Sequence, residues 1–325
     1  MSETKSDIVL EVKGLKKYFN VKKGIFGIPQ IVKAVDGVNL TVKINETHGM
    51  VGESGCGKTT LGRTIVRIYD PTEGQIIFKG KDITKTSNQF MIPIRKSIQM
   101  IFQDPYASLN PRLTVGEIIK EPLNIHKMYS PAEREEKVQE MLRFVGLMPD
   151  HIRRYPHEFS GGQRQRIGIA RAIILEPELI VCDEPISALD VSIQAQIINL
   201  LEKLRDEKGL SYLFIAHDLS MVKYISHRIS VMYLGHIVET GSSDDIYKNP
   251  VHPYTKALLS AVPVPDPKIA KNKTRMKLYG EIPSPINPPP GCPFFKRCQY
   301  AKNICEEEIP QLEEKAGRKV ACHIV

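Results

Sequence analysis

Along the chain, the pattern of hydrophobic and polar residues changes from short strand-like segments to helical periodicity and then to a proline-rich stretch. Alternation and β-branched residues predict strands within residues 8–12, 31–35, 38–42, 47–51 and 75–78. Two later runs, 179–182 and 212–216, are continuously apolar, which is typical of parallel strands covered on both faces. Because polar residues follow both runs, the pattern predicts a ligand site at the carboxyl ends of these strands.

Helical periodicity dominates between about residues 112 and 158. Ser130 and Glu133 form the sequence pattern of a capping box, and Pro131 stands at the first helical position. Apolar residues then recur at helical spacing until Gly146, which ends the run. We therefore predict a helical subdomain over about residues 112–165, inserted between two halves of an α/β domain.

The composition changes after residue 262. Nine of the 23 prolines lie between Pro263 and Pro293, and three consecutive prolines at 288–290 exclude a helix or a central strand there. The sequence predicts two parts. Residues 1–262 would form a nucleotide-binding cassette, and residues 263–325 would form a proline-rich linker followed by a small C-terminal domain.

The overall composition excludes several classes of protein. Hydrophobic residues make up 42% and charged residues 25% of the 325 residues, which is ordinary for a globular protein and unlike a disordered one. Neither a signal peptide nor an 18-residue apolar run is found, so we expect a cytosolic chain that reaches a membrane only through a partner. The net charge is +8, and half of the excess lies in residues 261–325. Charge alone is weak evidence for nucleic-acid binding, and we predict none.

A phosphate-binding loop is the first motif that carries chemistry. It fits G-x-x-x-x-G-K-[ST] and comes between a strand-like segment and a helix start. Glycines let backbone amides turn toward an anion, the lysine neutralises phosphate charge, and the threonine offers a hydroxyl to Mg²⁺. Cys56 stands at a free position and is expected to be a bystander. The predicted nucleotide contacts from this loop are Gly52, Glu53, Ser54, Gly55, Cys56, Gly57, Lys58, Thr59 and Thr60.

Two further motifs extend this chemistry. Asp183 and Glu184 end an apolar strand, where Asp183 can hold Mg²⁺ and Glu184 can polarise the attacking water. The stretch from Ser160 to Gln163 matches a capping box, but a cap alone does not require its two glycines. Bare amides and a serine hydroxyl at a helix start suit a second phosphate contact, which indicates ATP supplied by another subunit.

With Gln103, residues 187–190 and His217, these motifs occur in the order and rough spacing of ATP-binding cassette (ABC) ATPases. The chain resembles that family over about residues 8–260. The resemblance implies an α/β P-loop NTPase fold with a RecA-like core, an N-terminal antiparallel β region, a helical subdomain and a small Cys-rich C-terminal appendage. One departure is Phe159, where the family usually has Leu.

The resemblance also implies roles for single residues. Glu184, His217 and Gln103 would serve catalysis, with Gln103 and His217 near the γ-phosphate. Mg²⁺ would be held by Thr59, Gln103 and Asp183, and Phe19 or the neighbouring Tyr18 would stack on adenine. Two cassettes would close head to tail on ATP, so that one chain's site is completed by residues of the other. These completing residues would be Ser160 and Gly162, with Gly161 and Gln163 beside them as further nucleotide contacts. Asp190 would couple the facing sites across the dimer.

Three stretches narrow the subfamily: the phosphate loop, residues 101–111 and residues 280–292. They resemble the ATPase subunits of bacterial and archaeal dipeptide and oligopeptide importers, and Leu61 and Arg63 favour the second, F-type, of two paired ATPases. The implied function is ATP hydrolysis that drives peptide import. The ATPase would lie at the cytoplasmic face of the membrane. The implied partners are a second ABC ATPase subunit, two transmembrane permease subunits and, indirectly, an extracellular or periplasmic peptide-binding protein.

Other functions stay open at this point. Nickel or other solute importers have closely similar ATPases. A soluble cassette ATPase acting on ribosomes or DNA is disfavoured, because ribosomal types usually carry two cassettes and DNA-repair types carry long insertions. A subunit with a degenerate ATP site is disfavoured by the intact Lys58, Glu184 and His217.

The last 34 residues contain four cysteines, Cys292, Cys298, Cys305 and Cys322. In a chain without a secretion signal such a cluster more often binds metal than forms disulfides. The spacing lacks the C-x₂₋₄-C pairs common in zinc sites, and four thiolates also suit a [4Fe–4S] cluster. The resemblance favours the cluster, since some importer ATPases with this tail bind one. Zinc stays an alternative, and His323 is a further possible ligand.

Overall fold

The computed structural model describes residues 7–22, 29–187, 189–262, 276, 280, 283–288 and 290–325. The chain divides into two compact units. Unit 1 comprises Met1–Val9, Val42–Glu46 and Lys85–Ile215, and unit 2 comprises Leu10–Thr41, Thr47–Thr84 and Ala216–Val325. Most of the proline-rich linker expected after residue 262 lies outside the described residues, as does Ala188 in the stretch 187–190.

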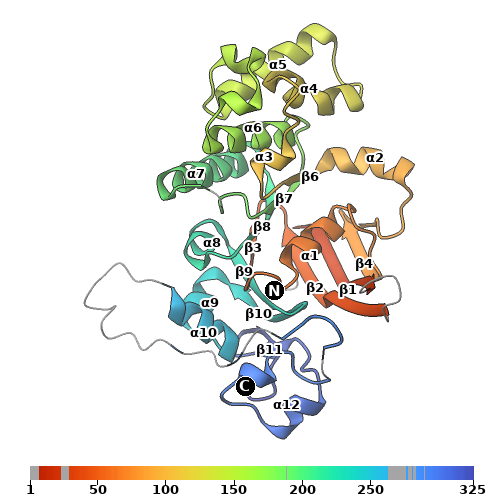
Figure 1. Ribbon diagram of the computed structural model, residues 1–325, viewed down its shortest axis with the longest axis vertical. Helices are drawn as coiled ribbons and strands as arrows, with labels where there is room; N and C mark the ends of the chain where they lie inside the picture. Colours follow the sequence, from red (N-terminus) through yellow and green to blue (C-terminus); the bar gives the residue numbers. More distant parts are fainter. Residues whose placement is uncertain are drawn as a thin grey trace, which may run out of the picture. The chain divides into compact units, whose positions relative to one another are not determined.

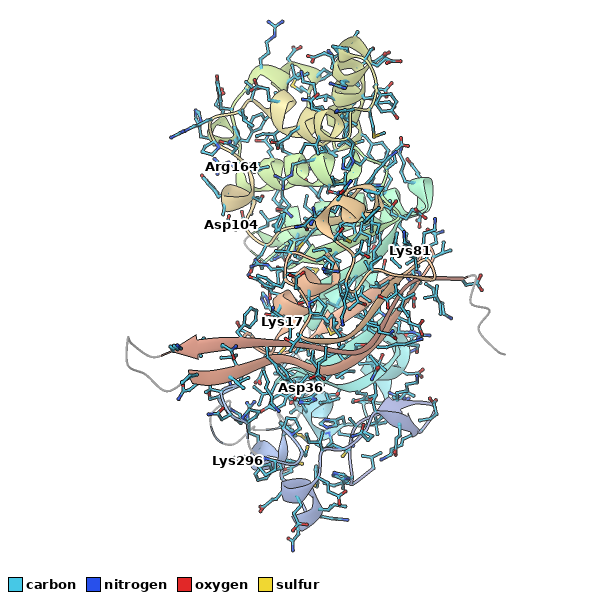
Figure 2. All side chains as sticks on the ribbon, turned by 90° about the vertical axis from the view of Figure 1, so that its right-hand side faces the viewer. Lys17, Asp36, Lys81, Asp104, Arg164 and Lys296 are labelled. Atoms are coloured by element: carbon cyan, nitrogen blue, oxygen red, sulfur yellow. The ribbon has the colours of Figure 1, made fainter. Side chains whose placement is uncertain are left out.

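Two long strands form the largest part of the N-terminal antiparallel sheet. β1 spans Ile8–Lys22 and β2 spans Pro29–Lys43, and the sheet order is β2-β1-β4-β5 with β4 at Glu73–Phe78 and β5 at Lys81–Asp82. Figure 2 shows the two long strands, with Lys17 and Asp36 labelled. The predicted strand structure at 31–35 and 38–42 is confirmed, but the two segments form one continuous strand instead of two. Backbone pairing continues past Gly37, and Val38, Leu40 and Val42 keep one face of a single strand buried.

The rest of unit 2 is built on a second group of strands. β3 (Thr47–Val51) runs parallel to β9 (Arg228–Tyr233), which pairs antiparallel with β10 (His236–Ser242). The hairpin of β11 (Glu313–Lys315) and β12 (Arg318–Val320) extends β10 on its other side. The helices of this unit are α1 (Lys58–Ile65), α8 (Leu219–Ile225), α9 (Ser243–Lys248), α10 (Pro253–Ala261) and α12 (Asn303–Glu307).

In unit 1, three parallel strands lie in the order β8-β7-β6. They are β6 (Ile98–Ile101), β7 (Leu179–Asp183) and β8 (Ser211–Ala216), and every residue of β7 and β8 is buried. Their continuous apolar sequence is therefore explained by burial on both faces, which confirms the parallel strands predicted at 179–182 and 212–216. Burial of such side chains contributes about 1.5–3 kcal/mol each.

Helices make up most of unit 1 (Figure 1). Capping boxes begin α4 at Thr114 and α5 at Ser130, and in each a glutamate side chain returns to the backbone of the cap residue. The predicted helix start at Ser130 is thus confirmed. The helices are α2 (Asn88–Ser97), α3 (Pro105–Ser108), α4 (Val115–Ile125), α5 (Pro131–Phe144), α6 (Gly161–Ile173) and α7 (Val191–Lys208), with 3₁₀ turns at Pro149–Arg153 and Pro156–Glu158.

A buried ion pair ties the C-terminal hairpin to the rest of unit 2. Glu239 of β10 is fully buried, and its carboxylate accepts hydrogen bonds from the backbone N–H groups of Val251 and His252. Arg318 of β12 lies 3.5 Å from the same carboxylate and also donates to the carbonyls of Asp245 and Asn249.

None of the helices in the described ranges is long and apolar enough to cross a membrane.

Candidate nucleotide site

The phosphate loop connects the end of β3 to the start of α1. Gly57, at the amino end of α1, has a φ of 108°, and a Cβ there would lie 2.0 Å from the carbonyl oxygen of Ala34. Glycine is therefore required at this position both by backbone conformation and by space. No side chain caps the first turn of α1, so its backbone N–H groups face the loop and favour an anion.

Lys58 lies inside the loop rather than in solvent, with only 4% of its surface exposed. Its Nζ donates to the carbonyl oxygens of Gly52, at 2.8 Å, and Glu53, at 3.0 Å, and lies 3.8 Å from Cys56 Sγ. The ammonium group therefore holds the two ends of the loop together. Burial raises the pKa of the Cys56 thiol, which keeps it protonated and supports its interpretation as a bystander.

The remaining loop residues differ in exposure. Ser54 and Gly55 are exposed at the tip of the loop, whereas Thr59 and Thr60 are half-buried in the first turn of α1.

In unit 1, Glu184 and Gln103 are brought together. Asp183 ends β7 and is fully buried, and Glu184 follows it with a φ of 45°, which is uncommon for a residue with a side chain. The backbone N–H of Glu184 donates to the carbonyl of Ile215 in β8, and Gln103 Nε2 donates to Glu184 Oε2 at 2.9 Å. Strained backbone of this kind clusters at functional sites, and here it aims a carboxylate at the amide that follows β6.

The stretch 160–163 begins α6 as a complete capping box. Ser160 Oγ accepts from the N–H of Gln163, and Gln163 Oε1 accepts from the N–H of Ser160. Gly162 faces α7 so closely that a Cβ would lie 2.5 Å from Ile193 Cγ2. Close packing of two helices therefore explains one glycine of the pair, while Ser160 itself is exposed and keeps its own hydroxyl proton to donate.

The same helix is fastened to the segments around it. Arg164 is buried, donates to the carbonyls of Pro156 and His157, and stacks 3.5 Å from the ring centroid of Tyr106 in α3. Figure 2 labels Arg164 together with Asp104, which caps α3. Phe159, the departure from the family's Leu, is buried and packs edge-on against His151. Phe159 therefore fills an apolar, buried position, as a leucine would.

The two candidate adenine-stacking residues lie on β1 with different partners. The Tyr18 hydroxyl donates to Asp36 Oδ1 at 2.5 Å, and burial together with this bond raises its pKa. Phe19 packs edge-on against Tyr69, and Lys17 Nζ lies 4.9 Å from the Phe19 ring centroid. Both rings are half-buried, and the assignment of an adenine platform to one of them stays a prediction.

Two predicted residues lie at helix starts. Asp190 caps α7 at an exposed position and makes no side-chain capping bond. His217 is exposed between β8 and α8, next to Asp218, whose carboxylate caps α8. Both positions suit contact with a ligand or another chain, and their roles also stay predictions.

The four C-terminal cysteines lie in one segment but differ in burial. Cys305 and Cys322 are buried, Cys292 and Cys298 are half-buried, and the N–H of Cys292 donates to the carbonyl of Cys305. Burial, and to a smaller extent the three other thiols, raise the pKa of Cys292 to about 11. Among the residues that the structure describes, no set of three or more His, Cys, Asp or Glu side chains is arranged to hold a metal ion. His323 instead contacts the carbonyl of Glu308.

Sequence reasoning missed a residue that touches the phosphate loop. Arg297, just before Cys298, forms an ion pair with Glu53 at 2.7 Å. No motif marks Arg297, and its separation of 244 residues from Glu53 hides the contact. The available signal was Glu53 itself, because an acidic side chain in an anion-binding loop calls for a cation.

Comparisons with known proteins agree with this geometry. A family model for ABC transporters matches residues 35–187, and a model for the C-terminal region of oligopeptide/dipeptide transporters matches residues 238–305. The oligopeptide transport ATP-binding protein AppF of Bacillus subtilis is 57% identical, covering 100% of this chain and 99% of that protein. The chain belongs to the ATP-binding subunits of ABC transporters. It is an ATPase of this family.

Other relatives and a solved structure are also similar to this ABC ATPase. It is 55% identical to the oligopeptide transport ATP-binding protein OppF of Escherichia coli, over 97% of this chain and 96% of that one. The dipeptide transport ATP-binding protein DppF of Escherichia coli is 50% identical, over 98% and 94%. The ATP-binding cassette MJ0796, solved as a dimer bound to ADP and Pi, aligns with a TM-score of 0.65 and 29% identity, over 72% of this chain and 98% of that one. The predicted cassette fold is thereby confirmed.

Replacing Glu184 with glutamine tests its predicted role. The amide keeps the shape and the contact with Gln103 but cannot polarise water, so Glu184→Gln should bind ATP normally and lose at least about a hundredfold of turnover. ATP binding by equilibrium dialysis and phosphate release would be measured together. Lys58→Ala is the matched control, since it should weaken binding itself, and near-normal turnover of Glu184→Gln would remove Glu184 from the reaction.

Proposed function

We propose that this ABC ATPase powers the import of dipeptides or oligopeptides through a membrane permease. The observation that carries the proposal is identity of 50–57% over nearly the whole chain with proteins named for oligopeptide or dipeptide transport. The match of residues 238–305 to the C-terminal region of such transporters supports it independently, because this region is additional to the general cassette.

The residues of the chain supply the parts of ATP hydrolysis. Lys58 and the amides of the phosphate loop bind phosphate groups, and Glu184, oriented by Gln103, accepts the proton of the attacking water. Thr59, Gln103 and Asp183 offer the oxygen ligands that Mg²⁺ prefers, and their chemistry fits that ion. Bound Mg²⁺ would neutralise charge on the phosphates. His217 would contact the γ-phosphate, and Phe19 or Tyr18 would stack on adenine.

We infer that two cassettes close head to tail on ATP. The dimer of MJ0796 with ADP and Pi supports this arrangement as a likeness. An exposed Ser160 with a free hydroxyl proton and an exposed Asp190 are the features that a facing chain would contact. The other chain would be a second ABC ATPase subunit in the importer, and two copies of this chain would close in the same way when no other subunit is present. Two transmembrane permease subunits and a peptide-binding protein outside the membrane would complete the importer, which places this chain at the cytoplasmic face.

The division into a cassette over 1–262 and a C-terminal part over 263–325 is likewise a proposal. We propose that the four cysteines of this C-terminal part bind a [4Fe–4S] cluster, with zinc as the alternative. Four thiols match the ligand number of the cluster, and each of Cys298, Cys305 and Cys322 influences the pKa of Cys292, which supports their being neighbours. Binding requires the side chains to turn toward one another, and the role would be structural rather than catalytic.

Co-purification and uptake together test the proposed function. A tagged chain extracted from its own membranes should bring two multi-spanning membrane proteins and a second cassette subunit. In proteoliposomes that complex should accumulate a labelled dipeptide or oligopeptide only with ATP, and Lys58→Ala should abolish accumulation. Uptake of ⁶³Ni²⁺ without peptide uptake would contradict peptide import, and association with ribosomes without membrane proteins would contradict transport.

Mixing two inactive variants tests the composite site. Ser160→Arg homodimers and Lys58→Ala homodimers should each be inactive, but a mixed dimer contains one complete head-to-tail site. Random pairing makes half of the dimers mixed, so roughly a quarter of wild-type turnover should return. Two affinity tags verify that mixed dimers are present. No recovery in a sample that contains them would overturn the head-to-tail arrangement.

Metal analysis of protein purified without oxygen tests the cysteine proposal. About four irons and four sulfides per chain, a brown colour and loss of both in Cys298→Ser are the expected results. Cys182→Ser is the matched control, because Cys182 is buried in β7 of the other unit. One zinc without iron would contradict the cluster but keep a metal-bound tail, and absence of both metals would contradict any metal site.

A further inference from the structure

The phosphate loop contains an unexpected negative charge. Glu53 directly follows Gly52, in a loop whose other features favour binding of an anion. At an effective dielectric constant of about 20, two like charges within several ångströms repel each other strongly enough to lower affinity severalfold or more. A carboxylate at this position therefore opposes the binding of ATP unless another group neutralises it.

Arg297 neutralises this carboxylate through a two-point contact. Its Nη1 lies 2.7 Å from Glu53 Oε2, and its Nη2 lies 3.1 Å from Glu53 Oε1. The Arg297 side chain is only 7% exposed and that of Glu53 is 22% exposed. An arginine guanidinium is charged at all ordinary pH values, so the contact with Glu53 joins two opposite charges. Paired, partly desolvated charges with bidentate geometry interact far more strongly than exposed ones.

The backbone of Glu53 is held by a second residue of unit 2. Its N–H donates to the Tyr254 hydroxyl at 2.9 Å, and Tyr254, at the start of α10, is fully buried. The rings of Tyr233 and Phe294 lie 4.7 and 5.4 Å from that of Tyr254, and all three pack at steep angles. Glu53 is thus fixed at its side chain and at its main chain by residues that follow the nucleotide-binding motifs in sequence.

Arg297 itself has a fixed position. It ends the 3₁₀ turn Phe295–Arg297, between Cys292 and Cys298, and its Nη1 also lies 3.4 Å from the Tyr233 hydroxyl. The preceding Lys296 is exposed, and it is labelled in Figure 2. Two neighbouring cations of the same turn therefore have different surroundings, one against the phosphate loop and the other in solvent.

We propose that Arg297 is a positioning residue of the ATP site, which neutralises the Glu53 carboxylate and holds it away from the bound phosphates. The C-terminal segment thereby sets the affinity of the phosphate loop for ATP. This inference depends on ATP binding at the phosphate loop, and it is independent of the transported solute and of any metal at the cysteines.

A charge-rescue experiment on the full-length protein tests it. In Arg297→Ala the unpaired Glu53 carboxylate should weaken ATP binding and raise the KM for ATP by about tenfold, with a much smaller change in kcat. Adding Glu53→Gln in the same chain removes the charge, so the double variant should regain most of the affinity. Arg297→Lys keeps the charge but loses the two-point contact and should fall between Arg297→Ala and wild type.

The matched control is Lys296→Ala, which removes a cation from the same turn without touching Glu53 and should leave the KM unchanged. Thermal unfolding of each variant distinguishes an effect of the unpaired charge on ATP binding from a loss of folding stability. An unchanged KM in Arg297→Ala would overturn the proposal. A double variant no better than Arg297→Ala would also overturn it, because that result marks Arg297 as a purely structural residue. If Arg297→Ala does not fold, Arg297→Lys with and without Glu53→Gln decides the same question. Failure of the wild-type protein to bind ATP would contradict the ATP site itself, which is a separate outcome.

Discussion

A phosphate loop must keep several backbone N–H groups turned toward one point, and no loop of glycines holds that shape alone. In unit 2 the shape is imposed by neighbours. Ala34 of β2 leaves no room for a side chain at Gly57, and Lys58 ties the two ends of the loop together through carbonyl oxygens. Glu53 is bound at its N–H and at its carboxylate. The conformation that binds an anion is therefore a property of the surrounding packing.

The other unit has a different requirement, which is to aim one carboxylate. Glu184 adopts an unfavourable backbone conformation directly after a fully buried strand, and Gln103 binds its side chain. Conformational strain of this kind persists only when the surroundings determine it, and here β8 fixes the Glu184 N–H through Ile215. Rigid strands thus position Glu184, whereas Ser160 and Asp190 are exposed at the starts of α6 and α7.

Much of this could be predicted from the sequence, because most of the chemistry is contiguous. The phosphate loop, the acids at the end of β7 and the capping boxes at Ser130 and Ser160 are short patterns with local physical causes. The length of β2 could not be predicted, since pairing with a neighbour carries the strand through Gly37. Arg297 was missed for the same reason. Its role depends on a contact between distant parts of the chain, and neither periodicity nor spacing records such contacts.

The separation of Arg297 from Glu53 also has a consequence in time. A ribosome that has just made Glu53 must add 244 more residues before Arg297 exists. At ordinary rates of synthesis this takes roughly 10 to 50 s. β9, which pairs with β3, is made only late in that interval, and even then the carboxylate beside Gly52 has no guanidinium to oppose it until Arg297 follows. A nascent cassette would therefore attract nucleotide poorly, and its affinity would rise only when the C-terminal segment had emerged and docked.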